Sequence, residues 1–174
     1  MSAGLLSGCS SDAGASAGTG ADGSLTLAAI KSPIQLLRNE AAGRIPADVV
    51  DSIVQPTDKS SACKPSSEDP DENWRTWTSE VLTIIAYDKA RPVSDIEDEL
   101  IASFVDQGWV EGEAPADKTT RLIKDTTFAT IDISAVAQDT TFEVPGQIQL
   151  IVGGPCVLTD GPTSAEVTKL EGKG

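Results

Sequence analysis

The chain has 174 residues, the length of one domain, and 39% of them are hydrophobic, which is enough for a single core. Its formal net charge is −14, and residues 64–117 alone hold 14 acidic and 4 basic side chains, a net charge of −10. Such a surface repels phosphate backbones and no cluster of Lys and Arg offsets it, so we exclude nucleic acid as a partner. No apolar run reaches the roughly 18 residues of a membrane-spanning helix, so any membrane attachment is expected to be covalent or peripheral.

A short motif near the N-terminus, Leu6-Ser7-Gly8-Cys9, places a branched apolar residue and two small residues before a cysteine. This pattern is typical of the bacterial lipobox and predicts that Cys9 is diacylated and becomes the mature N-terminus. We interpret residues 1–9 as the remnant of a signal peptide, and we expect a basic and apolar leader upstream of Met1. The alternative is an incidental cysteine in the leader of a cytosolic protein.

Residues 10–24 contain only Ser, Gly, Ala, Thr and Asp. This composition cannot bury apolar surface and is typical of a flexible coil, so we interpret the segment as a tether between the anchor and the domain. We place a single folded domain at residues 25–161 and a polar C-terminal tail at residues 162–174.

Once Cys9 is assigned to lipid, Cys63 and Cys156 remain. An even remainder in an exported domain predicts one disulfide, which would close a loop of about 93 residues. Cys63 lies in a polar coil, and Cys156 follows Gly153-Gly154-Pro155 at the end of a predicted strand. The chain has no His and no CxxC motif, which argues against a zinc or redox site.

The first half of the domain predicts one helix and one strand. Ser32 and Gln35 form a capping box around Pro33, so we expect a helix from Pro33 to Gly43. Residues 46–54 are expected to add a turn, and residues 55–73 a polar loop that holds Cys63. Residues 77–87 are rich in β-branched and apolar side chains, typical of a central strand covered on both sides.

A second helix is expected from Asp95 to Gln107, because Ser94 and Glu97 form a capping box and Gly108 ends the pattern. Its apolar side chains recur with helical spacing and predict one buried face, made of Ile96, Leu100, Ile101, Phe104 and Val105. Trp109 is expected to fold back on the last turn.

From Thr119 onward the hydrophobic period becomes two, which predicts strands at residues 119–124, 128–136 and 141–152. Pro145-Gly146 inside the last run indicates a bulge or an edge position. The element order α-β-α-β-β-β predicts an α+β fold, a two-layer sandwich with helices on one face of an antiparallel sheet of about four strands.

Two groups of residues are candidates for chemistry. Asp69, Asp71, Asn73 and Glu80 occupy the first, third, fifth and twelfth places of a calcium loop, although Trp74 stands where such a loop needs glycine. The alternative is an acidic solvated loop. The acidic residues that begin the second helix are explained by its dipole, and no nucleophile motif is present. We therefore expect no catalytic residue and no cofactor.

The three tryptophans have two interpretations. Near loop ends they can form a platform for carbohydrate or peptide, or they can close a core. We expect Trp77 and Trp109 to be buried and Trp74 to be exposed.

Together, the lipobox from Leu6 to Cys9, the spacer and the late Gly154-Pro155-Cys156-Val157 resemble the small lipoproteins of the actinobacterial cell envelope. The resemblance implies a location, lipid-anchored at the outer face of the bacterial cytoplasmic membrane, but no activity. We expect a non-catalytic binding or accessory module whose sheet face or loop edge engages an envelope protein or a small ligand. The alternative is an envelope hydrolase that works through a pair of carboxylates.

Overall fold

The computed structural model describes residues 25–88, 91–124 and 129–172, so Cys9 and the predicted tether lie outside the described residues. In chain order the elements are α1 (Leu27–Gly43), β1 (Val50–Ala62), β2 (Trp74–Ile85), α2 (Val93–Val105), β3 (Val110–Gly112), β4 (Thr119–Lys124), β5 (Ala129–Val136), β6 (Gly146–Gly153), β7 (Val157–Leu158) and α3 (Ala165–Leu170). None of the helices in these ranges is long and apolar enough to span a membrane.

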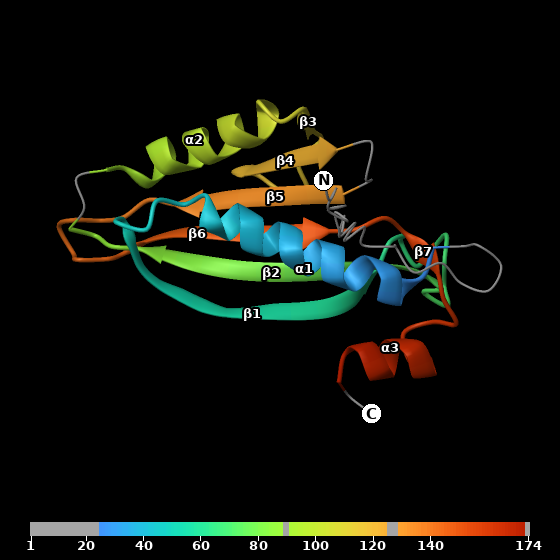
Figure 1. Cartoon of the computed structure of the whole chain (residues 1–174). Helices are drawn as coiled ribbons and strands as arrows, with labels where there is room; N and C mark the ends of the chain where they lie inside the picture. Colours follow the sequence, from blue (N-terminus) through green and yellow to red (C-terminus); the bar gives the residue numbers. More distant parts are fainter. Residues whose placement is uncertain (1–24, 89–90, 125–128, 173–174) are drawn as a thin grey trace, which may run out of the picture.

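The strands form one antiparallel sheet in the order β1-β2-β6-β5-β4-β3, and β7 pairs with β2 beyond the end of β6. α1 packs on β2 and β6, whereas α2 packs on β4, β5 and β6 (Figure 1). The predicted α+β class and antiparallel sheet are confirmed. The prediction of about four strands in the order α-β-α-β-β-β is wrong, because seven strands form and α3 follows them.

The core lies between the two large helices and one face of the sheet. Register places Val81 of β2 opposite Leu150 of β6, and Leu150 opposite Ile133 of β5, so this row of apolar side chains points to the helices. Burial along β2 alternates strictly between buried and partly buried positions. The prediction that this strand is covered on both sides is therefore wrong, since helices cover one face only.

α1 begins six residues before the predicted start. Thr26 caps it, its hydroxyl oxygen accepting from the Ala29 amide at 3.2 Å, and Pro33 lies inside the helix instead of at its first position. An internal proline costs a helix about 3 kcal/mol. Burial of Leu27 and Ile30 against the sheet offsets this cost, because both continue the buried stripe that Ile34 and Ala41 extend.

α2 begins near the predicted place but with a different cap. Pro92 is the N-cap residue, and no side chain of the predicted Ser94 box caps the helix. Instead the side-chain oxygen of Gln138, from the β5–β6 connection, accepts from the Val93 amide at 3.1 Å. The start of α2 packs closely on the start of β6: a Cβ on Gly146 would lie 2.3 Å from the Val93 side chain. The close approach therefore requires glycine at position 146.

Four elements form where no regular structure was expected, namely β1, the short strands β3 and β7, and α3. β1 occupies residues predicted as a turn and a polar loop. Among the described strands it pairs only with β2, most of its residues are exposed, and its register shifts around Pro56. Such an edge strand carries no alternating pattern for sequence analysis to detect. α3 lies in the predicted polar tail, yet Val167 is buried and the Glu171 carboxylate accepts from the Ser60 amide of β1 at 2.8 Å.

The last long predicted strand is shorter than expected. Residues 139–145 form a turn closed by an isolated bridge between Asp139 and Val144, and β6 starts only at Gly146. Pro145 therefore precedes the strand and makes no bulge within it. By contrast β4 spans the predicted residues, and β5 covers Ala129–Val136, while Phe128, the predicted start, lies outside the described residues.

Candidate functional site

An apolar cleft of about 400 Å³ separates α1 from the end of the sheet where β4 meets β5. Nine of its twelve lining side chains are apolar and three are polar. The lining consists of Leu25, Ala29, Ile30, Pro33, Ile34, Leu37, Glu40, Gln107, Trp109, Lys124, Ala129 and Pro155. Small-molecule sites have volumes of about 300 to 1,000 Å³ and walls of this character, so the cleft is the candidate site.

The cleft exists because α1 carries two apolar stripes. The first packs on the sheet; the second, Ala29, Pro33 and Leu37, repeats every four residues along the neighbouring side of the helix and lines the cleft. No helix in the described ranges packs over this second stripe. The C-terminal ends of α1 and α2 are in contact through Arg44 and Ser103. The N-terminal end of α1 lies away from α2, at the end of the sheet where β7 lies (Figure 1).

Arg44, the C-cap residue of α1, holds two polar side chains of the lining, Glu40 and Gln107. Its guanidinium donates to the Ser103 carbonyl oxygen at 2.8 Å, and to side-chain oxygens of Gln107 and Glu40 at 2.5 Å each. It also lies 3.7 Å from the ring centroid of Phe104. Arg44 thus hydrogen-bonds two of the three polar side chains in the described lining, and the rest of the lining, apart from Lys124, is apolar.

Trp109 forms the wall opposite α1. The chain turns at Gly108, whose φ of +83° favours glycine, and the Trp109 amide then donates to the Phe104 carbonyl oxygen at 3.2 Å. The two rings meet edge to face with centroids 5.4 Å apart. The Nζ atom of Lys124 lies 5.7 Å from the Trp109 ring centroid, and Lys124 is the one cationic residue among the described residues that line the cleft. The predicted fold-back of Trp109 is confirmed.

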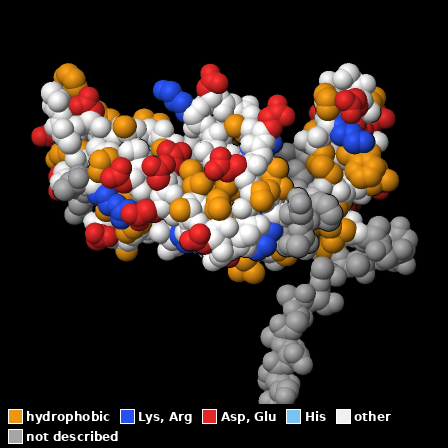
Figure 2. All heavy atoms as spheres, turned by 90° about the horizontal axis from the view of Figure 1, so that it is seen from above, with side chains coloured by type: hydrophobic (Ala, Val, Ile, Leu, Met, Phe, Trp, Pro, Cys, Tyr) orange, Lys and Arg blue, Asp and Glu red, His pale blue; other side chains and the backbone are white. Residues whose placement is uncertain are grey.

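The surface around the helices is acidic. Figure 2 shows Asp and Glu side chains spread over this side of the molecule, with apolar side chains gathered between them. Burial, followed by the neighbouring Asp98 carboxylate, raises the pKa of Glu97. Neither side chain lines the cleft, whose lining holds one carboxylate, that of Glu40. A hydrolase of the carboxylate-pair type needs two facing acids, and the described lining does not supply them.

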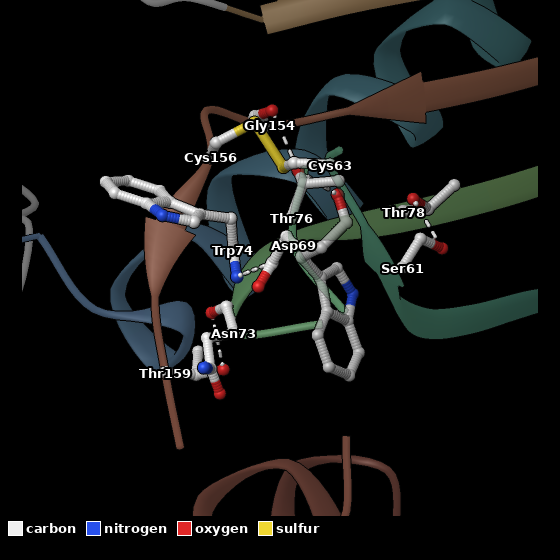
Figure 3. The surroundings of a disulfide bond; sticks show 11 residues. Ser61, Cys63, Asp69, Asn73, Trp74, Thr76, Thr78, Gly154, Cys156 and Thr159 are labelled. Atoms are coloured by element: carbon white, nitrogen blue, oxygen red, sulfur yellow. Dashed lines mark hydrogen bonds between the residues drawn. A yellow bond between two sulfur atoms is a disulfide. The ribbon is translucent and has the colours of Figure 1, made fainter. Parts of the chain in front are cut away.

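Leu25 and Pro155 also line the cleft, and Pro155 is followed by the disulfide. Cys63 and Cys156 are bonded with an S–S distance of 2.24 Å and a Cα–Cα distance of 6.0 Å. The Thr76 hydroxyl also donates to the Gly154 carbonyl oxygen at 2.7 Å (Figure 3). The bridge therefore ties the end of β1 to the segment that leaves β6 and borders the cleft.

The predicted calcium ligands are not brought together. The Asp69 carboxylate accepts from the Trp74 amide at 2.7 Å, and the Asn73 backbone oxygen accepts from the Thr159 amide at 2.8 Å (Figure 3). Glu80 lies in the middle of β2, where its carboxylate accepts from Gln149 at 2.5 Å. Asp71 is exposed. No group of three or more Asp, Glu, Cys or His side chains in the described ranges could hold a metal ion, so the calcium hypothesis is wrong for these residues.

A buried polar cluster joins α1 to β1 and β2. Arg38 is 7% exposed and donates to the Ser79 hydroxyl at 2.7 Å and the Asp58 carboxylate at 3.2 Å. Burial alone would raise the Asp58 pKa, but hydrogen bonds from Ser79, Gln35 and Trp77, together with the charge of Arg38, hold it below its ordinary value. These groups satisfy one another under the helix, so the cluster stabilises the fold.

The uncovered face of the sheet was the other surface on which a partner was expected. It carries polar pairs that match each other across strands: Arg121 of β4 donates twice to the Asp132 carboxylate of β5, at 2.7 Å each. The pair between Gln149 and Glu80 lies on the same face. The same register places the partly buried apolar side chains of Leu82, Ile84 and Ile151 on this face, so it mixes paired polar groups with apolar ones.

The tryptophan predictions are confirmed: Trp77 is fully buried, Trp109 is 4% exposed and Trp74 is 36% exposed. The cleft itself was not predicted, although the spacing of Ala29, Pro33 and Leu37 is a signal that could have indicated a second apolar side of α1. Comparison with protein-family models, with curated proteins and with solved structures finds no match for this chain.

Proposed function

We propose that this protein is a lipid-anchored, extracytoplasmic binding module of the bacterial cell envelope, and that the cleft beside α1 takes up a small apolar ligand without chemical conversion. The cleft carries the proposal, because burying apolar ligand surface against nine apolar side chains releases about 25 cal/mol per Å². The Arg44 bridge and the Trp109 wall are held by contacts within the protein, so the cleft exists before a ligand binds.

The proposed location rests on the sequence motif and on the cysteines. The lipobox predicts an anchor at Cys9, and disulfides such as that between Cys63 and Cys156 persist in oxidising compartments and are rare in the cytosol. Lipid attachment at Cys9 would hold the domain at the outer face of the cytoplasmic membrane, so the membrane is the proposed partner through the anchor.

Titration of the full chain with a neutral naphthylamine fluorophore, which brightens in apolar surroundings, tests binding at the cleft. Ala29→Trp places a large side chain in the cleft and should weaken binding at least tenfold. Leu36→Trp adds the same side chain to the same helix at a position that is 67% exposed and outside the lining, and should leave binding unchanged. Equal affinity of the two variants would show that the fluorophore binds elsewhere, and the proposal would fail.

A further inference from the structure

We propose that two copies of this chain pair through the face of the sheet that α1 and α2 leave uncovered, so that the two sheets stack between two outer layers of helices. This uncovered face carries Thr78, Gln149 and Ser134, whereas the two helices pack on the other face (Figure 1). The cleft of the proposed function lies on the helix side of the sheet, so pairing through the uncovered face is independent of it. Four properties of the face support the pairing: its charge, its bonded polar groups, its apolar centre and its size.

The uncovered face has no net charge, although the chain has a net charge of −14. Alternation along the described strands directs about two dozen side chains at paired positions to this face, and four of them are charged. Lys59 and Arg121 are basic and Glu80 and Asp132 are acidic, so their formal charges cancel. Two copies of an acidic protein repel one another least through a neutral surface, which favours this face for self-association.

The polar groups in the middle strands of this face are bonded to one another. Arg121 donates from two nitrogen atoms to the Asp132 carboxylate at 2.7 Å each, and the Gln149 amide donates to the Glu80 carboxylate at 2.5 Å. Burial of a charge is strongly unfavourable when it leaves that charge without a partner. These four side chains keep their partners when a second copy covers the face, so covering them leaves none of them unsatisfied.

Beside these polar pairs the face has an apolar centre. Leu82 and Ile84 of β2 and Ile151 of β6 are partly buried there, and Val54 of β1, opposite Leu82, is 48% exposed. Leu82 and Ile151 are diagonal neighbours across the strand pair, a spacing at which long side chains meet. Toward the end of the sheet where β7 lies, hydroxyl side chains such as that of Thr76 replace the apolar ones. An apolar centre with a polar margin is typical of an interface between subunits.

The size and shape of this face fit a second sheet. The path from β1 to β3 contains six strands, which at about 4.8 Å apart give a width of about 24 Å. Stable interfaces use about 20 to 30 residues from each partner, which is about the number of side chains that point to this face. A second copy carries a sheet of the same width and twist, and pairing about a two-fold axis covers both faces at once. The occupant that fits the face is therefore a second copy of this chain.

Sedimentation velocity of the full chain carrying Cys9→Ser tests the pairing, because this change removes a thiol that could join two copies by itself. The chain should sediment as a dimer at about 100 µM. Leu82→Lys should raise the dimer Kd at least about hundredfold, because it places an ammonium group without a partner in the apolar centre. Leu36→Lys adds the same charge to α1 at a position that is 67% exposed, and it should change the Kd by less than about twofold.

Cross-linking at the centre of the face gives a second measurement that does not depend on the folding of Leu82→Lys. Ile151 lies on a middle strand of the sheet, so a two-fold axis through the face places it close to its own copy. With Cys9→Ser also present, a bismaleimide of about 8 Å should join two copies of Ile151→Cys, since facing sheets pack about 10 Å apart. Val105→Cys places a thiol on α2 at a position that is 43% exposed, and it should give no cross-linked dimer.

Ionic strength distinguishes an apolar contact from one held by charge. Added NaCl should strengthen the dimer, because salt screens the repulsion between two chains of net charge −14. A dimer that dissociates in salt is held by ion pairs, and this result would overturn the proposal. So would a dimer that resists Leu82→Lys, or one that cross-links through Val105→Cys and not through Ile151→Cys, because each of them uses another surface. A chain that stays monomeric up to about 500 µM leaves the face to a different partner and also overturns the proposal.

Discussion

Truncation of Phe104 to alanine is expected to destabilise the domain by about 3 to 5 kcal/mol. Phe104 is fully buried at the end of α2, its ring meets Trp109 edge to face at 5.4 Å, and the Arg44 guanidinium lies 3.7 Å from its centroid. The change removes transfer free energy, leaves a cavity and ends both ring contacts. For a domain of this size the loss corresponds to a decrease in Tm of roughly 10 °C.

Val105→Ala is the matched control, since the neighbouring side chain on the same helix is 43% exposed and should change stability by less than about 0.5 kcal/mol. Denaturant melts followed by tryptophan fluorescence measure both variants. Similar midpoints for the two would refute the assignment of the inner face of α2. Val105 was predicted on the buried face with Phe104, and the structure corrects this, because the stripe of Val93, Ile96, Leu100 and Phe104 turns Val105 outward.

Three further outcomes are expected. Replacing Cys63 and Cys156 by serine should lower the free energy of unfolding by roughly 4 to 5 kcal/mol, because the bridge closes a loop of 93 residues, and chemically reduced wild type should unfold at the same denaturant concentration. The pKa of Asp58 in the folded protein lies below its ordinary 3.8, so the ionised carboxylate stabilises the fold fully above pH 3.8. This stabilisation is lost as the pH falls below 3.8 toward the lower pKa of the folded state. In acid titrations of unfolding, Asp58→Asn should therefore lose less stability over this range than the wild type. A lipid analogue fed to cells that export the protein should label it at Cys9, and equal labelling of Cys9→Ser would contradict the lipobox.

Elements with a strong hydrophobic period were predicted, and elements without one were not. Ile96, Leu100 and Phe104 define α2 because their spacing matches a helix, and β5 alternates as a half-buried strand does. β1 carries mostly exposed polar residues, and of the strands that the structure describes it pairs with β2 alone. Its strand conformation therefore depends on a partner that its own residues do not indicate.

Local signals failed where tertiary packing opposed them. Ser32-Pro33 has the composition of a helix start, yet burial of Leu27 and Ile30 extends α1 through it. Ser94 has the composition of a cap, yet Gln138 supplies the hydrogen bond to the first turn. In both cases contacts from distant residues outweigh an effect of about 1 to 3 kcal/mol that the local sequence favours.

By itself the sequence determined the α+β class and the burial of Trp77, Leu100 and Phe104. It also predicted the pairing of Cys63 with Cys156, which are bonded in the structure. Tertiary structure alone decided the strand order, the side chains that surround Asp69 and Glu80, and the cleft beside α1. The reason is physical. A hydrophobic period records which side of an element avoids water, but not the element against which that side packs or how far apart two helices lie on one sheet.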